Sequence, residues 1–328
     1  MATYKEIYGS TIEVVTSDPE NPVTGQIWYN STDNVVKGFQ LTAAGSWSSG
    51  GNTNTSRYWG ASAGDSTSGI TMGGFNTPIG PGITNTELYN GTSWTEVNDL
   101  NSGRYIQSAA GTQTAALNFG GTPPGGPFSG QTESWNGTSW TEVNDLNTAR
   151  RQAGSSGIQT SALMFGGSPT TSSDESATES WNGTSWTEVN DLNTARSSLD
   201  GGAIGVDNTS ALAAGGYQYS IPGSVALTES WNGTSWTEVN DVPAAGGGHK
   251  FGTVSSAHLG NALTNYIWDG TSWASDTANS NNLTSRAGAG TTSAGMIVGG
   301  EPPSPAGTTT TEEYLGAGSP ITVTFTDS

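Results

Sequence analysis

The stretch WNGTSWTEVNDLNTAR decides the fold; it runs from Trp135 to Arg150 and is repeated unchanged from Trp181 to Arg196. A close copy begins at Tyr89, and shorter copies begin at Trp231 and Trp268. The steps between the second aromatic residues of the copies are 46, 46, 50 and 37 residues, at Trp94, Trp140, Trp186, Trp236 and Trp273. Four short strands with their turns occupy such a length, so the period predicts the blades of a β-propeller.

Each repeat is expected to form four strands. In one copy, Arg104 opens the first strand, and Ala116–Gly121, which ends in a Gly pair, is the second. Thr132–Trp135 is the third strand, and Thr138–Val143, in which apolar and polar residues alternate, is the fourth. Asn136–Gly137 between them predicts a tight hairpin with both turn residues at positive φ. No segment has a sustained period of 3.6 residues, so helices should be almost absent.

Two incomplete repeats set the expected number of blades. Arg286–Tyr314 supplies three strands without a fourth, and the segment around Trp47 is a fourth strand without the first three. Pairing them would close the ring and remove both sheet edges. We therefore predict six blades, or seven if the N-terminal hairpin forms its own blade. The fifth blade is expected to be trimmed, because His249–Lys250 replaces the Arg and Gly260–Asn261 replaces the Gly pair.

The ends of the chain differ in character from the repeats. Residues 1–44 are predicted to be a small β segment, with a strand at Thr11–Val15 and a hairpin over Gly25–Gln40. Residues 45–316 form the predicted propeller, and 317–328 a final strand that we expect to pair with Thr11–Val15.

The order of an Arg-led strand, a Gly pair, a Glu beside an aromatic residue and a Trp about six residues later resembles the kelch repeat family. The resemblance covers roughly residues 45–316 and implies a kelch-like β-propeller. The hairpin Gly25–Trp47 resembles one found in tail, fibre and adhesin proteins of bacteriophages, and the repeat resembles that of kelch-type proteins of marine phages. This implies a virion protein, assembled in the host cytoplasm and exposed on the extracellular particle.

Most of the repeated side chains are expected to be structural, since a binding site seldom needs so many copies. The recurring Arg residues should pair with the recurring Glu residues, and the Trp residues should fill the contacts between blades. The Arg residues are Arg57, Arg104, Arg150, Arg196 and Arg286. The Glu residues are Glu87, Glu133, Glu179, Glu229 and Glu312. Trp47 joins the five Trp residues named above.

Composition excludes several classes of function. The chain has no Cys, so a disulfide framework or thiolate metal site is impossible. The net charge of −19 argues against a nucleic-acid partner, and no apolar run is long enough for a membrane span. Glu96, Asn98 and Asp99 offer oxygen ligands for Ca²⁺, but turn formation explains them better. We expect no enzyme activity, no catalytic residue, no metal and no cofactor.

The copies disagree in the segments after each Gly pair, at 75–85, 122–131, 168–177, 217–227 and 301–310. Variable loops on a constant scaffold are typical of recognition, although unconstrained drift would look the same. The candidate ligand-binding residues are Phe75, Phe128, Tyr217 and Tyr219. We expect a module that binds a host-surface glycan or protein in several copies, while residues 1–44 bind other virion proteins. The alternatives are a structural capsid or tail decoration and a secreted bacterial adhesin.

Overall fold

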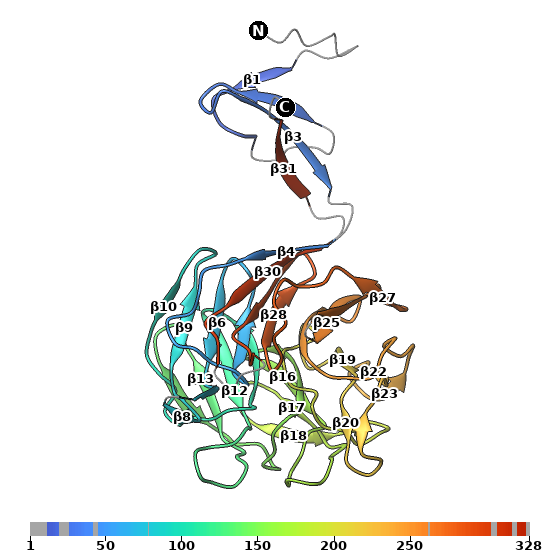
Figure 1. Cartoon of the computed structure of the whole chain (residues 1–328). Helices are drawn as coiled ribbons and strands as arrows, with labels where there is room; N and C mark the ends of the chain where they lie inside the picture. The colour runs from blue at the N-terminus through green and yellow to red at the C-terminus, as the bar shows by residue number, and fades with distance from the viewer. Residues whose placement is uncertain are drawn as a thin grey trace. The chain divides into compact units, whose positions relative to one another are not determined.

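The computed structural model describes residues 12–19, 26–41, 45–77, 79–261, 263–302, 307–316 and 320–325. Within these ranges the chain is entirely β, and no helix could span a membrane. It divides into two units, residues 46–315 and residues 1–45 with 316–328 (Figure 1). The second unit joins the two chain ends, so the last strand does not stand alone.

The described part of the larger unit contains five four-stranded sheets, one three-stranded sheet and two small two-stranded sheets. Five of the six larger sheets are each built from one repeat, and the sixth combines the last repeat with the strand Ser46–Ser49. The first two sheets comprise β5 (Ala61–Gly64), β6 (Gly69–Met72), β9 (Thr86–Tyr89), β10 (Trp94–Glu96), β11 (Ser108–Thr112), β12 (Ala115–Phe119), β13 (Thr132–Trp135) and β14 (Trp140–Val143). The next two comprise β15 (Gly154–Ile158), β16 (Ser161–Phe165), β17 (Thr178–Trp181), β18 (Trp186–Val189), β19 (Ala211–Ala214), β22 (Thr228–Trp231) and β23 (Trp236–Glu238). The last two comprise β24 (His249–Thr253), β25 (Ser256–Asn261), β26 (Thr264–Trp268), β27 (Trp273–Asp276), β28 (Ala287–Thr291), β29 (Ala294–Val298), β30 (Thr311–Leu315) and β4 (Ser46–Ser49).

The first strands of the sheets follow one another around a closed circuit. β5 contacts β11 and β28, β11 contacts β15, and β24 contacts β28. Between β15 and β24 lies a short segment in which Ala203 bridges to Ser155 and Ile204 to Gly252. β4 pairs antiparallel with β30, and Trp47 lies opposite Tyr314 in this pairing. The first and last repeats therefore share one sheet.

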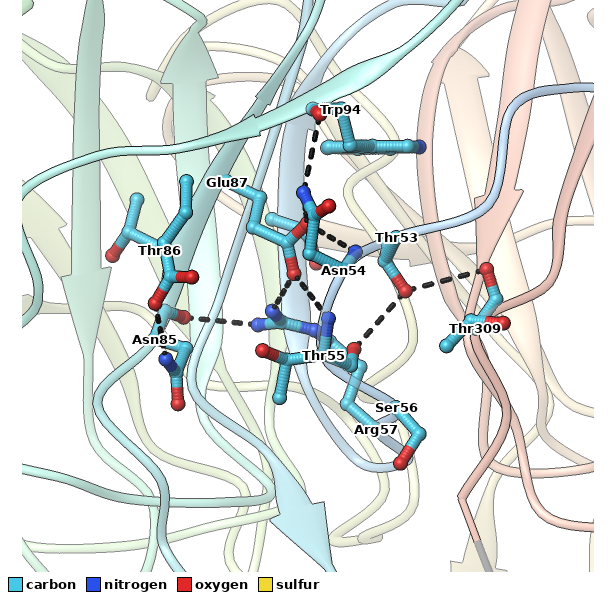
Figure 2. A network of polar contacts seen from close by, with 12 residues as sticks. Thr53, Asn54, Thr55, Ser56, Arg57, Asn85, Thr86, Glu87, Trp94 and Thr309 are labelled. Atoms are coloured by element: carbon cyan, nitrogen blue, oxygen red, sulfur yellow. Dashed lines mark hydrogen bonds and ion pairs between the residues drawn. The ribbon is translucent and has the colours of Figure 1, made fainter.

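Each Arg and Glu of the repeat form a buried hub that fixes the linker entering the sheet. Glu87 Oε1 accepts from Arg57 Nη2 at 2.6 Å and from the Thr55 backbone at 3.0 Å, while Oε2 accepts from the Asn54 backbone at 2.6 Å (Figure 2). Arg57 Nη1 also donates to the carbonyl of Asn85. All five pairs are buried: Arg57–Glu87, Arg104–Glu133, Arg150–Glu179, Arg196–Glu229 and Arg286–Glu312.

The position of the Arg differs from the prediction in two respects. Arg104 does not open the first strand, which begins four residues later at Ser108. Arg286 directly precedes β28 and therefore occupies the position of Gln107, not that of Arg104. Its guanidinium still reaches Glu312, because a long side chain can approach the same carboxylate from either backbone position.

The Asn–Gly turn is also different from the one predicted. Gly137 has φ of 90°, but Asn136 is not in the left-handed region. The Asn136 side chain accepts from the backbone N–H groups of Thr138 and Ser139, both at 2.9 Å, and four residues separate Trp135 from its partner Trp140. The Asn therefore stabilises a longer turn through its side chain instead of adopting positive φ.

The rest of the repeated stretch joins neighbouring sheets. Trp140 Nε1 donates to Thr86 Oγ1 of the preceding sheet at 3.0 Å, and Asn98 Nδ2 donates to the Thr138 carbonyl of the next sheet at 2.8 Å. Asp99 Oδ1 accepts from the backbone of Thr86. The polar atoms of Asn98 and Asp99 therefore bond to backbone groups within and between sheets. Among the described residues, no three acidic or His side chains cluster in a way suited to a metal.

The fifth repeat keeps all four strands, β24 to β27, and its third strand β26 begins only three residues after β25 ends. The fourth repeat is the one that lacks its first strand. The segment replacing that strand is squeezed between its neighbours: a Cβ on Gly202 would lie 1.8 Å from the Lys250 carbonyl oxygen, and one on Gly205 would lie 2.0 Å from Ser156 Oγ. Only glycine fits at such positions.

The smaller unit is a four-stranded sheet of β1 (Glu13–Val15), β2 (Ile27–Asn30), β3 (Val35–Leu41) and β31 (Pro320–Phe325). The prediction that the last strand pairs with Thr11–Val15 is wrong. β31 pairs with β3, whose seven residues offer a longer ladder than the three of β1. β1 pairs in parallel with β2 at the opposite edge, which the long connection between them allows.

Candidate functional site

Five residues with strained backbones lie at one position of the repeat, in four cases two residues before the first strand of a sheet. They share a left-handed backbone with φ between 53° and 58°, and we call them the collar: Trp59, Ile106, Gln152, Ser198 and Ser285. Backbone hydrogen bonds link them in series, since Trp59 N donates to Ser285, Ile106 N to Trp59 and Gln152 N to Ile106. Non-glycine residues rarely adopt this conformation, and such strain concentrates at binding sites.

A cavity of about 290 Å³ opens at the collar. Its walls come from the collar residues Trp59, Gln152, Ser198 and Ser285, together with Asp200, Tyr217 and Asn261. These residues belong to the first, third, fourth, fifth and sixth repeats. The volume is at the lower end of small-ligand pockets, roughly 300–1,000 Å³, and suits one small ring.

Aromatic side chains gather beside this cavity. The ring of Trp59 stacks on that of Tyr105 with centroids 6.1 Å apart, and Phe75 packs edge-on against Tyr105 at 5.5 Å. Tyr58 packs against Trp59 at 4.8 Å. We call these four residues the aromatic cluster. Tyr58 is buried and the other three are partly exposed, so the cluster offers flat apolar surface next to the cavity.

Two residues of the cavity lining, Gln152 and Asp200, carry hydrogen-bond acceptors. Gln152 Oε1 makes no hydrogen bond among the described residues, but it is covered in this conformation. The half-buried Asp200 carboxylate accepts from its own backbone N–H; burial raises its pKa, whereas Lys250 and Arg151 attract the charged form. A carboxylate can accept several further bonds, so Asp200 is the candidate acceptor for a ligand that carries hydrogen-bond donors.

The four predicted ligand-binding residues do not form one site. Phe75 belongs to the aromatic cluster and Tyr217 lines the cavity. Tyr219 packs edge-on against Tyr217 at 5.1 Å without lining the cavity. Phe128 is separate from the cavity walls, because its ring lies 4.4 Å from the guanidinium carbon of Arg151. That cation–π contact explains why this loop aromatic faces its neighbour.

The sequence reasoning missed the collar and Asp200. A signal is present in the sequence, because the collar position holds Trp, Ile, Gln and Ser in the first four repeats and Ser in the sixth. This variation lies close to the repeated Arg, outside the segments after the Gly pairs. Asp200 had no signal of this kind, since the segment that carries it has no counterpart in the other repeats.

Two further hollows carry no comparable chemistry. One of about 80 Å³ is lined by small residues of the first strands, such as Ala109, Gly157 and Gly252. The other, of about 470 Å³, lies at a joint between two repeats, where Asn144 already donates to the Thr184 carbonyl. The cavity at the collar remains the candidate site.

Comparison with known proteins supports the architecture alone. No protein-family model matches the chain, and no curated protein matches it. A solved structure of YjhT is similar, with a TM-score of 0.65 and 11% sequence identity over 79% of this chain and 95% of that chain. Identity this low shows the fold and nothing of the activity. Together with the circuit of antiparallel sheets, the likeness identifies the chain as an all-β protein with a propeller-like fold.

Proposed function

We propose that this chain is a non-enzymatic binding module that recognises a saccharide at the collar of a six-bladed, kelch-like propeller. The observation that carries the proposal is the cavity itself, whose lining combines the Asp200 carboxylate with the aromatic side chains of Trp59 and Tyr217. Aromatic faces bind the apolar faces of sugars, and acceptors bind sugar hydroxyl groups. The count of six blades is supported by the six larger sheets and by the circuit of first strands.

The proposed setting is a phage virion, exposed to the host surface, with several copies on each particle. This rests on the resemblance of the repeat and of the hairpin Gly25–Trp47 to phage proteins. Many copies would turn a weak single-site affinity into firm attachment. The net charge of −19 would repel nucleic acid.

The smaller unit is proposed to bind other virion proteins. Several of its apolar residues are exposed: Ile12, Val14, Ile27 and Phe325. Val14, with 67% exposure, lies on the edge strand β1, whose outer side has no partner strand among the described residues. Exposed apolar groups and open sheet edges are typical of interaction surfaces.

Replacing Trp59 by Ala is expected to weaken saccharide binding at least tenfold, because the stacking face of the cavity is lost. Binding of host-envelope polysaccharide fragments would be measured by calorimetry. The matched control is I221A, since Ile221 is 75% exposed in the variable 217–227 segment but does not line the cavity. W59F should retain part of the affinity. Equal binding by W59A and the parent would exclude this site.

The rival function is structural decoration of the capsid or tail. It is favoured by the five buried ion pairs and the repeated joints, which make a stiff scaffold without any need for a ligand. Particles lacking the protein distinguish the two. Loss of adsorption supports recognition, whereas fragile particles that still adsorb support decoration.

A further inference from the structure

The lining of the cavity indicates which kind of hydrogen-bond donor a ligand should carry. Its one carboxylate belongs to Asp200, on the irregular segment that replaces the first strand of the fourth repeat. Gln152 also lines the cavity, but its Oε1 is covered in this conformation and does not reach the cavity surface. A ligand group that donates several N–H bonds would therefore find its acceptor in the Asp200 carboxylate.

Lys250 and Arg151 attract the Asp200 carboxylate from nearby, but neither lies within ion-pair distance of it. Lys250 donates to the carbonyls of Leu199 at 3.2 Å, Asp200 at 3.0 Å and Gly248 at 3.0 Å. An ammonium group has three donors, so none is left for the Asp200 carboxylate. Arg286, which also lines the cavity, is paired with Glu312. The carboxylate therefore has no ion-pair partner among the described residues.

The walls of the cavity favour a cation as well. Trp59 and Tyr217 both line it, and the face of an aromatic ring attracts an ammonium group. The net charge of −19 raises the local concentration of cations over the whole surface. Burial raises the pKa of Asp200, and an incoming cation would favour its charged form.

We propose that the cavity selects saccharides bearing a free, protonated amino group, with the ammonium held by the Asp200 carboxylate against the aromatic wall. This proposal rests on the proposed saccharide-binding function and narrows its ligand class to amino sugars. The sugar ring itself would lie against Trp59.

The test compares a glucosamine trimer with an N-acetylglucosamine trimer, which has the same ring skeleton without the charge. At pH 6 and low salt the amine trimer is expected to bind about five- to tenfold more tightly, because a charge-assisted hydrogen bond is added. D200N should equalise the two affinities, and W59A should weaken both. The control E142Q removes an exposed carboxylate outside the cavity and should leave the preference intact.

The outcomes distinguish the proposed amino-sugar selectivity from the saccharide-binding function on which it rests. If the acetylated trimer binds as tightly as the amine trimer and depends on Trp59, the amine selectivity is wrong and saccharide binding stands. If the preference persists in D200N, overall charge causes it and the Asp200 site is wrong. If neither trimer nor any neutral oligosaccharide binds, the proposed function fails. Circular dichroism of D200N checks its fold.

Discussion

Replacing Glu133 by Gln is expected to lower the free energy of unfolding by about 3–5 kcal/mol. The Glu133 carboxylate is buried, pairs with Arg104 and accepts from the backbone N–H groups of Asn101 and Ser102. An amide leaves the buried guanidinium without its counter-charge and cannot accept all of these bonds. Thermal unfolding should show a decrease in Tm on the order of 10 °C, given roughly 2–4 °C per kcal/mol for a domain of this size.

The control for E133Q is E142Q, at the residue directly opposite Glu133 on β14. Glu142 is exposed, so its neutralisation should change the unfolding free energy by less than about 0.5 kcal/mol. An equal effect of the two substitutions would mean that the buried hub does not stabilise the fold. The same test applies to Glu87, Glu179, Glu229 and Glu312, which occupy equivalent hubs.

Acid should destabilise the protein through two buried histidines. His249 and His258 stack with centroids 5.5 Å apart, and neither ring nitrogen of His258 makes a hydrogen bond. Burial lowers the pKa of His258 to about 3 and that of His249 well below its usual value. Their pKa in the unfolded chain is about 6.5, so the unfolded chain binds more protons below that pH. Stability is then lost as pH falls from about 6.5, by roughly 3 kcal/mol at pH 4.5 for His258, and His249 adds to this loss in the same direction.

Urea unfolding between pH 8 and pH 4.5 measures this loss, and H258F isolates the part due to one ring. A Phe at this position would stack on Phe251, whose ring lies 4.7 Å from that of His258 at 3°. The variant should lose about 1.4 kcal/mol less per pH unit below 6.5 than the parent. The Asp276 carboxylate, 3.7 Å from His258, opposes the effect by attracting a charged ring. Identical slopes for H258F and the parent would show that this attraction compensates for burial.

The fold class was readable from the sequence because its signals are local and repeated. The Gly pairs, the alternating Thr-Ser-Trp-Thr-Glu-Val strand and the 46-residue period each predict four short strands per repeat. The two incomplete repeats also led to the pairing of β4 with β30. Packing decided the details instead. Asn136 uses its side chain where positive φ was expected, and Arg286 reaches its Glu from a shifted position.

The candidate site was harder to predict from the sequence than the fold, because its residues come from five repeats. Tyr217 was predicted from its variable segment, and it does line the cavity. Gln152, Ser198 and Ser285 are ordinary residues whose importance comes from a shared backbone conformation. Asp200 depends on the loss of a strand in the fourth repeat, which the sequence did not predict.

The irregular segment between β15 and β24 also bears on how the chain finds its native pairing. Near-identical repeats can exchange partners during folding, and a strand of one repeat fits almost as well in the next; this is the characteristic misassembly of repeat proteins. The segment Gly201–Gly205 fits only beside Ser156 and the Lys250 carbonyl, where its glycines leave no room for a side chain. We expect this close approach to disfavour a pairing shifted by one repeat, because the shift would bring side chains into a gap that holds only glycine.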